Sequence, residues 1–383
     1  MPQIENCIRE QLYNCNQLHN LGVFARNGCS ALLYLANDQV RNNNNHTSII
    51  ELYLNRIQQI SPGIISADLS TGVCGFGFVL NYMLGFDQLG QKSIRTLQVI
   101  DDIAMATINK YLDKSNVDYL YGASGILMYL IERSEKSKRV KKGLSDIIER
   151  YISCGMHHLS HNFWYDSVNS KELMESIISL GFSHGMLSCI TLLIRAKMLG
   201  FSCLNLDDTI HRSLDFVNST KCIDKGTGIF PALIPDRHNQ VINSRLGWCY
   251  GDLPVAITYL YAAVVYDKYD YYTKAKLILH SCVKRISEDE IGYVDNSICH
   301  GYAGLGMLFW SAYLHSKEKI FSEHALYWKN ISSDMIIDQY RTSDFRNEIN
   351  KGTLDGPIGT VLANTSLNEN HRINSWKKLF LLF

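Results

Sequence analysis

Residues 122–131 read Gly-Ala-Ser-Gly-Ile-Leu-Met-Tyr-Leu-Ile, two glycines three positions apart followed by a run of uncharged apolar residues. This glycine step recurs along the chain, with about 50 to 66 residues between successive first glycines. Such an interval fits a pair of helices with their loops and is long for a unit of an open solenoid. Complete copies begin at Gly72, Gly122, Gly301 and Gly356, and copies that keep only the first glycine begin at Gly185 and Gly251.

Apolar residues are distributed differently in the segments after the glycine steps and in the segments between them. After each step they occupy nearly every side of the expected helix, which is typical of a helix buried all round. Between the steps the pattern is amphipathic, and Leu144, Ile147, Ile148 and Tyr151 form one helical stripe. This alternation predicts an all-α protein in which inner helices surround an axis and outer helices cover them.

Composition and length exclude several classes of protein. Lysine plus arginine and aspartate plus glutamate each number 37, so the chain lacks the net basic charge expected of a nucleic-acid-binding protein. The longest charge-free apolar stretch of note, Leu253–Tyr266, covers about 14 residues, whereas a transmembrane helix needs about 20. No secretory signal is visible in Met1–Leu21, and the eleven cysteines are too sparse for a disulfide scaffold. We therefore expect a cytoplasmic protein with reduced thiols, and one domain over residues 1–383 because no linker divides the chain.

Three motifs that carry reactive side chains lie on the glycine steps. They are Gly181-Phe-Ser-His184-Gly185, Trp248-Cys249-Tyr250-Gly251 and Cys299-His300-Gly301. In a closed ring of hairpins these loops would meet at one axial mouth, so that Cys249, Cys299 and His300 converge. Two thiolates and one imidazole suit Zn²⁺ and leave a fourth position open, as in catalytic zinc sites. Packing of the cysteines as small apolar side chains is the alternative that the spacing leaves open.

Two further clusters have a structural and a functional interpretation. Cys154, His157, His158 and His161 form a second possible metal site, although a solvent-exposed polar turn explains them better. The basic stretch 133–142 is interpreted as a solvated loop, with a docking patch for an acidic peptide segment, such as a leader peptide, as the functional alternative.

The three motifs, in this order on helical repeats, resemble the lanthionine synthetase C-like family, which includes the stand-alone cyclases of class I lanthipeptide (lantibiotic) biosynthesis. The resemblance extends from Gly72 to Trp376 and its apolar tail. It implies an α/α toroid, a double-layered barrel of six to seven helical hairpins. Six glycine steps are visible, and the region Gly226-Thr-Gly228 is the candidate for the seventh hairpin.

The resemblance also assigns roles to individual positions. The matched residues are the zinc ligands Cys249, Cys299 and His300 for one Zn²⁺ per chain, the acid/base His184, the functional aspartate Asp118, and Arg245 and Tyr250 bordering the zinc. A helix N-cap is an equally good explanation of Asp118, and one side chain is able to serve both purposes. Pro254 replaces the second glycine of its step, and Asp252 lies where the family often has a small residue, so we expect a reshaped pocket wall.

The implied reaction is the intramolecular Michael addition of a peptide cysteine thiolate to dehydroalanine or dehydrobutyrine, which forms a lanthionine or methyllanthionine thioether ring. Nothing in the sequence resembles a dehydratase. The expected partners are therefore a dehydrated precursor peptide (leader plus core), a separate dehydratase and an export transporter, with no nucleic acid. Any contact with the membrane is expected to be peripheral, through a biosynthetic complex.

Two other functions fit the same residues. One is a relative that binds glutathione and adds it to dehydro residues of proteins without closing a ring. The other is a noncatalytic scaffold that presents precursor peptides to enzymes.

Overall fold

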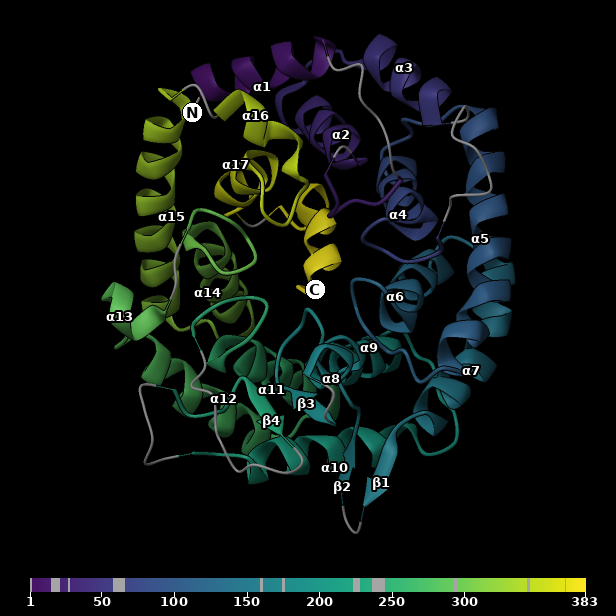
Figure 1. The fold of residues 1–383 in the computed structure, drawn as a ribbon, viewed down its shortest axis with the longest axis vertical. Helices are drawn as coiled ribbons and strands as arrows, with labels where there is room; N and C mark the ends of the chain where they lie inside the picture. Colours follow the sequence, from purple (N-terminus) through teal and green to yellow (C-terminus); the bar gives the residue numbers. More distant parts are fainter. Residues whose placement is uncertain are drawn as a thin grey trace.

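The computed structural model describes residues 2–14, 21–26, 28–57, 66–158, 161–173, 176–222, 228–235, 245–292, 295–342, 345–368 and 370–383. Within these residues, seven buried helices form a ring in which each helix contacts the next and the last contacts the first (Figure 1). They are α2 (Ser30–Asn42), α4 (Val73–Leu84), α6 (Ala123–Ser134), α9 (Met186–Met198), α11 (Asp252–Tyr266), α14 (Tyr302–Ser316) and α17 (Pro357–Thr365).

A second layer of helices surrounds this ring, as Figure 1 shows. It consists of α3 (Thr47–Ile57), α5 (Gln91–Leu112), α7 (Lys138–Ser153), α10 (Leu206–Ser219), α12 (Tyr269–Cys282) and α15 (Lys319–Tyr340), with α1 (Pro2–Asn14) at the N-terminal edge. The inner helix α6 is buried along its whole length, whereas α7 buries one stripe that includes Leu144, Ile147, Ile148 and Tyr151. The prediction of an all-α, two-layered α/α toroid is confirmed.

The seventh hairpin is not where the sequence placed it. Residues 226 and 227 lie outside the described residues, and Gly228 belongs to the connection between α10 and α11. The missing inner helix is α2, which starts after Cys29 without a glycine step. The backbone of this repeat approaches the neighbouring repeat at Gly22, upstream of α2, where a Cβ would stand 1.7 Å from the carbonyl oxygen of Ser70.

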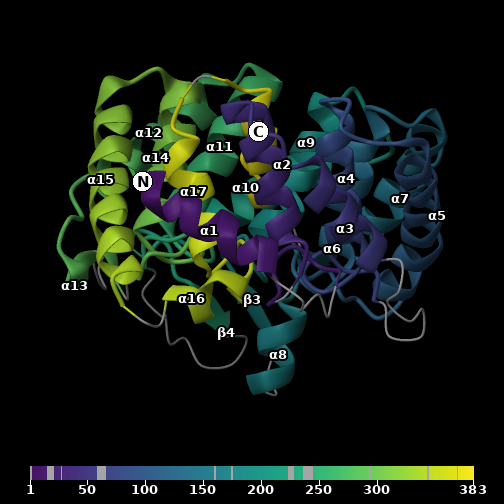
Figure 2. The same ribbon diagram turned by 90° about the horizontal axis from the view of Figure 1, so that it is seen from above.

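The short elements lie in the loops between helices. They are β1 (Met156–His158), β2 (His161–Phe163), α8 (Ser167–Leu173), β3 (Ile177–Ser179), β4 (Leu233–Pro235), α13 (Glu288–Ile291), α16 (Phe345–Glu348), η2 (Ile349–Lys351) and η3 (Ile373–Phe380). Strands β1 and β2 pair antiparallel with Met156 opposite Phe163, and β3 and β4 pair antiparallel with Ile177 opposite Pro235. Figure 2 shows α8, β3, β4 and α16 together at one end of the ring.

Backbone hydrogen bonds join the loops that precede the inner helices. The amide of Ser70 donates to the Leu120 carbonyl (2.9 Å), and the amide of Ile298 donates to the Leu354 carbonyl (3.0 Å). The amide of Thr353 donates to the carbonyl of Val23 (3.3 Å), which links the last repeat to the first. The loops therefore form one mouth at the N-terminal ends of the inner helices.

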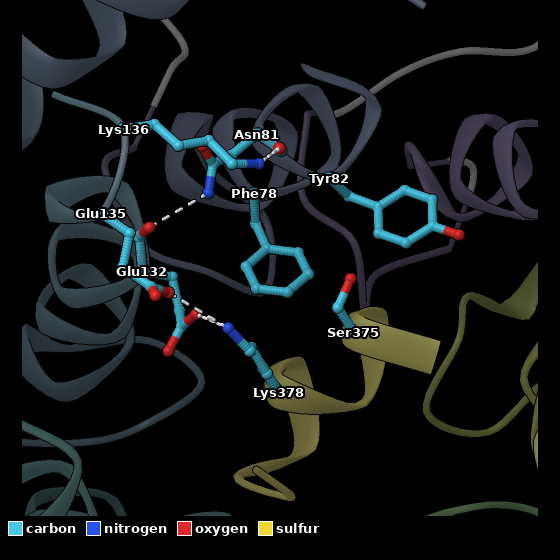
Figure 3. Close-up of a pocket in the computed structure, with 8 residues that line it drawn as sticks. All are labelled: Phe78, Asn81, Tyr82, Glu132, Glu135, Lys136, Ser375 and Lys378. Atoms are coloured by element: carbon cyan, nitrogen blue, oxygen red, sulfur yellow. Dashed lines mark hydrogen bonds and ion pairs between the residues drawn. The ribbon is translucent and has the colours of Figure 1, made fainter. Parts of the chain in front are cut away.

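The C-terminal segment fills the axis of the ring (Figure 1). The Tyr119 hydroxyl donates to the Leu379 carbonyl (2.7 Å), and the Trp248 indole N–H donates to the Phe380 carbonyl (2.8 Å). The next residue toward the N-terminus, Lys378, places its ammonium 2.5 Å from the Glu132 carboxylate near the C-terminal end of α6, beside a cavity of about 50 Å³ (Figure 3). The axis is thus closed by side chains on the face opposite the mouth.

The basic stretch 133–142 is only partly a solvated loop, because it spans the end of α6 and the start of α7. Arg133 is buried and pairs with Asp101 (3.1 Å), and the Lys136 ammonium donates to the Asn81 carbonyl (2.7 Å). Arg139 pairs with Asp102 at the surface. The expected buried core helix over Leu253–Tyr266 is α11, and no described helix has both the length and the apolar character needed to cross a bilayer.

Removing the charge of Glu132 is expected to destabilise the protein strongly. Its carboxylate is 4% exposed and contacts both Arg195 (2.7 Å) and Lys378, whose charges hold its pKa below the usual value despite burial. Glu132→Gln leaves two partly buried cations without this partner, so the free energy of unfolding in urea should fall by about 3 kcal/mol.

Glu135→Gln is the matched control, because Glu135 contacts the same two cations at 3.2 Å but is 43% exposed. It should cost less than about 1 kcal/mol. Equal effects of the two substitutions would contradict a buried ionic anchor.

Candidate functional site

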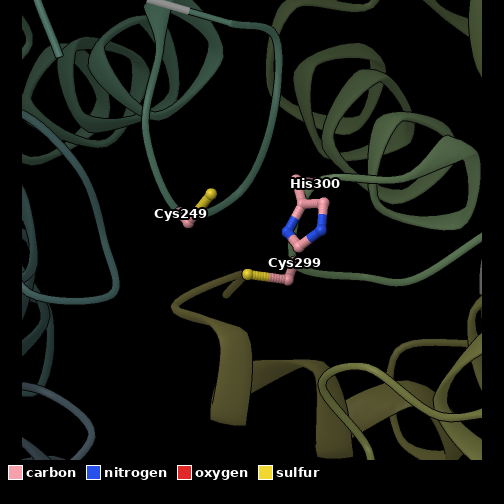
Figure 4. Close-up of side chains that lie close together, drawn as sticks. All are labelled: Cys249, Cys299 and His300. Carbon is pink, nitrogen blue, oxygen red and sulfur yellow. The ribbon is translucent and has the colours of Figure 1, made fainter. Parts of the chain in front are cut away.

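Two loops bring Cys249, Cys299 and His300 together at the mouth (Figure 4). Cys249 precedes α11 and Cys299 and His300 precede α14, and their ligand atoms lie within 4.8 Å of one another. The carbonyl oxygen of Cys299 accepts hydrogen bonds from the amides of Trp248 (2.9 Å) and Cys249 (3.0 Å). The predicted convergence of these three residues is therefore confirmed.

The donor set of this cluster suits a zinc ion. The pKa of Cys249 is lowered, first by its hydrogen bond with Cys299 and then by His300 and Arg245, whereas the Cys249 sulfur raises the pKa of Cys299. The Nε2 atom of His300 lies 3.1 Å from an Asp295 carboxylate oxygen, and this contact, with Cys249, raises the pKa of His300 to about 10. A carboxylate that orients the imidazole in this way is typical of metal-binding histidines. The cluster is able to hold a metal ion.

Asp118 is not the N-cap of α6, which is Gly122, but its carboxylate closes the turn before that helix and contacts His184. Its Oδ1 atom accepts a hydrogen bond from the Tyr121 amide (2.7 Å) just before α6, and its Oδ2 atom lies 2.5 Å from Nδ1 of His184. Asp68 occupies the same place before α4, and its Oδ1 atom accepts a hydrogen bond from the Thr71 amide (2.7 Å). Asp118 thus closes a turn as Asp68 does and also orients His184.

His184 lies beside the cysteine loop. A Cβ at Gly181 would stand 1.8 Å from the Cys249 carbonyl oxygen, and the Ser183 hydroxyl donates to that same oxygen (3.3 Å). Burial alone would lower the pKa of His184, but the hydrogen bond and charge of Asp118 outweigh it and raise that pKa. Asp118 therefore holds the His184 imidazole by a hydrogen bond and favours its protonated form, beside the loop of Cys249.

Tyr250 and Arg245 complete this side of the mouth. The phenol oxygen of Tyr250 accepts a hydrogen bond from the Asn169 side-chain amide (3.1 Å), and burial raises the pKa of Tyr250 to about 12. The positive charge of Arg245 is one cause of the lowered pKa of Cys249. Its carbonyl oxygen would lie 2.0 Å from a Cβ at Gly251, whose φ of +127° also favours glycine.

Asp252, one of the residues that depart from the expected motif, connects the start of α11 to neighbouring loops. Asp252 is fully buried and accepts hydrogen bonds from the amides of Ile229 and Phe230, both at 3.0 Å. Its carboxylate also faces Arg285 at 3.3 Å. Trp248 is fully buried among aromatic rings and has a packing role.

The second possible metal site does not form. The thiol of Cys154 faces the Leu112 carbonyl oxygen (3.5 Å), and Nδ1 of His157 lies 2.8 Å from the Asn162 side-chain oxygen in the β1–β2 hairpin. Among the described residues, Cys249, Cys299 and His300 make up the one group of three or more possible ligands that lie close together. Cys154 and its neighbouring histidines therefore lie in or next to the β1–β2 hairpin and make local contacts there.

Sequence reasoning missed Asp295 and Asn169. Asp295 lies six residues before Gly301, outside the glycine step, and Asn169 lies in the insertion between α7 and α9. Asn169 belongs to no repeated pattern. Asp295 takes the place that Asn116 has before Gly122, and the side-chain oxygen of each accepts from the amide two residues later, but the residue type at this place differs between repeats. An acidic residue shortly before a Cys-His pair was the one local signal available for Asp295.

Comparisons with known proteins agree with this architecture. A family model described as "Lanthionine synthetase C-like protein" matches residues 27–381. The chain is 22% identical over 347 residues to the nisin biosynthesis protein NisC of Lactococcus lactis subsp. lactis, which covers 84% of this chain and 78% of that protein. The solved structure of a nisin cyclase superposes with a TM-score of 0.82 at 17% identity, covering 100% of this chain and 98% of the other.

Proposed function

Because the chain belongs to the lanthionine synthetase C-like family, we propose that it is a lanthipeptide cyclase. In this reaction a cysteine of a dehydrated peptide adds to a dehydroalanine or dehydrobutyrine of the same peptide and forms a thioether ring. The observation that carries the proposal is the meeting of Cys249, Cys299 and His300 at the mouth of the toroid, beside the His184–Asp118 pair.

Cys249, Cys299 and His300 would hold one Zn²⁺, and three protein ligands leave one position for a substrate sulfur. When bound, the ion supplies the charge that keeps a cysteine thiol deprotonated at neutral pH. Asp295 would hold the His300 ring in the orientation that this requires. Cys299 and His300 are only partly buried, so the cluster faces the mouth from which a peptide would arrive.

The chain's other residues would manage the proton that the cysteine thiol loses and the α-carbon gains, so that ring closure consumes no proton overall. As the carbon–sulfur bond forms at the β-carbon, the double-bond electrons move toward the carbonyl group and give an enolate, which then takes a proton at the α-carbon. His184, whose pKa is raised by its contact with Asp118, would donate that proton. The positive charge of Arg245 would stabilise the enolate oxygen.

The proposal includes partners and a location. The substrate would be a dehydrated precursor peptide, made by a separate dehydratase and removed by an export transporter. Cys249 and Cys299 must stay reduced for this chemistry although their sulfur atoms lie within 4.8 Å, and the cytoplasm keeps thiols in that state.

The zinc-loaded protein should cyclise a peptide that contains one cysteine and one dehydroalanine. Because ring closure is an isomerisation, the peptide mass stays the same while its alkylatable thiol disappears, which is measured by mass spectrometry after treatment with a maleimide. Cys299→Ala should bind no zinc and leave the thiol intact, since one of two thiolate ligands is lost. Cys154→Ala is the matched control and should retain both zinc and activity, because Cys154 lies outside the cluster.

The same assay separates the other two functions. A glutathione-adding enzyme would raise the mass of a cysteine-free dehydro peptide by one glutathione and would close no ring. If the protein is a scaffold, the wild type and Cys299→Ala should bind the peptide with the same affinity, and the peptide should keep its thiol with both. Each of these results would contradict the cyclase proposal.

Replacing His184 tests the proton donor. His184→Asn should retain zinc, because residue 184 is not a ligand, but should slow ring closure by about 10²–10⁴-fold, the usual contribution of a general acid or base. The rate and the zinc content are measured on the same preparation. Ring closure at the full wild-type rate with zinc retained would remove His184 from the mechanism.

Asp118→Asn should lower the pKa of the His184 imidazole, because it removes the hydrogen bond and charge that raise this pKa and leaves the effect of burial. The pKa is read from an NMR titration of the imidazole resonances. Asp68→Asn, the equivalent change before α4, should leave it unchanged. An unchanged His184 pKa in Asp118→Asn would show that the pair does not interact as the geometry indicates.

A further inference from the structure

Helix α8 lies at the mouth end of the ring, where Figure 2 shows it projecting beyond β3 and β4. It is tied to the repeat that carries Asp118, because the Ser167 hydroxyl donates to the Asn116 side-chain oxygen (2.9 Å), which also accepts from the Asp118 amide (3.2 Å). It is tied to the repeat that carries Cys249 through Asn169 and Tyr250. One short helix thus connects both sides of the proposed active site.

The orientation of the Asn169 side chain is fixed by Asp166. The Asp166 carboxylate is 1% exposed and accepts hydrogen bonds from the amides of Val168 (3.0 Å) and Asn169 (2.8 Å). It also accepts from the Asn169 side-chain nitrogen at 2.6 Å. A carboxylate with three N–H partners is an acceptor, so the NH₂ group of Asn169, and not its oxygen, must face it. The amide cannot be flipped without placing two oxygens in contact.

The second hydrogen of that NH₂ group is donated to Tyr250. The distance from Nδ2 to the phenol oxygen is 3.1 Å, and an amide nitrogen has no lone pair to accept with, so the phenol is the acceptor. The single proton of the Tyr250 hydroxyl is therefore directed away from α8. The phenol also interacts with the Ser183 hydroxyl, whose own proton is given to the Cys249 carbonyl (3.3 Å), so Ser183 is the acceptor available to the Tyr250 proton in the free protein.

We propose that Asn169 is a positioning residue that occupies the acceptor side of the Tyr250 hydroxyl and so keeps it a hydrogen-bond donor, which turns from Ser183 to the carbonyl oxygen of the substrate's dehydro residue. The inference rests on the proposed cyclase function. The carbonyl oxygen gains negative charge as the carbon–sulfur bond forms, and a hydroxyl already held as a donor stabilises that charge by turning only its O–H bond. Tyr250 keeps its proton throughout, and the α-carbon receives its proton from His184.

A double-mutant cycle tests the positioning role. Asn169→Ala should lower kcat for ring closure about 10-fold with KM nearly unchanged, because the lost interaction acts on the developing enolate. Tyr250→Phe should lower kcat at least as much, and the double variant should be no slower than Tyr250→Phe. A full additional 10-fold loss in the Tyr250→Phe background, or no loss in Asn169→Ala alone, would overturn the proposal.

Ser170→Ala is the control for the placement of α8. The Ser170 hydroxyl accepts from the Ile177 amide (2.9 Å) and anchors the same helix without contacting Tyr250. Its kcat and zinc content should equal those of the wild type. If kcat falls as much in Ser170→Ala as in Asn169→Ala, only the position of α8 matters, and the specific role of Asn169 is overturned.

A measurement without turnover separates this inference from the proposed function. In protein labelled with ¹³C at the tyrosine ζ carbon, the Tyr250 resonance is identified by its absence in Tyr250→Phe. At constant neutral pH this resonance should shift in Asn169→Ala and stay in place in Ser170→Ala. If the wild type closes no ring, the cyclase proposal fails, but the spectrum still tests whether Asn169 positions Tyr250. An unshifted Tyr250 resonance in Asn169→Ala overturns the positioning role, and a shifted resonance supports it.

Discussion

The hydrogen bonds that the amides of Trp248 and Cys249 donate to the Cys299 carbonyl fix the distance between two loops that are distant in the sequence. They form because the inner helices close into a ring and bring all their N-terminal loops to one mouth. With the carbonyl of Cys299 held against the loop of Cys249, the two thiols and the His300 imidazole have little freedom to separate. The metal-binding cluster is thus a consequence of ring closure, and its ligands need no local sequence motif such as a Cys-x-x-Cys pair.

Two further parts of the chain support this cluster from opposite sides. From within the axis, the C-terminal segment offers backbone carbonyls to Tyr119 and Trp248, the immediate neighbours of Asp118 and Cys249 in the sequence. From the mouth, α8 contacts Asn116 and Tyr250. The loops that carry the reactive side chains are therefore held by the C-terminal segment on one side and by α8 on the other. Within them, His184 keeps Asp118 as its hydrogen-bond partner.

Much of this arrangement is predictable from the sequence. The alternation of all-round apolar and amphipathic segments determines the two layers, and glycine steps mark six of the seven described inner helices. Cys249, Cys299 and His300 were expected to converge because all three precede such a step. The roles of Arg245 and Tyr250, in contrast, came from family resemblance, since neither their spacing nor their type indicates a function.

The features that escaped prediction depend on contacts between loops of different repeats. Helix α2 starts after Cys29 without a glycine step, because Gly22 makes the close approach seven residues earlier. Asn169 contacts Tyr250 from an insertion that has no counterpart in the other repeats. Asp295 contacts His300 from a loop position that Asn116 fills in another repeat, so the position recurs but its carboxylate does not. A periodic pattern carries no information about such contacts.

The central claim is that the substrate sulfur joins Cys249, Cys299 and His300 on one metal ion. Zinc K-edge X-ray absorption of the zinc-loaded protein tests it directly, before and after addition of a cysteine-containing peptide, because sulfur ligands are distinguished from lighter ones by their longer distance of about 2.3 Å. We predict two sulfur ligands in the free protein and three in the complex. Two sulfur ligands in both states, with the peptide bound, would contradict the account.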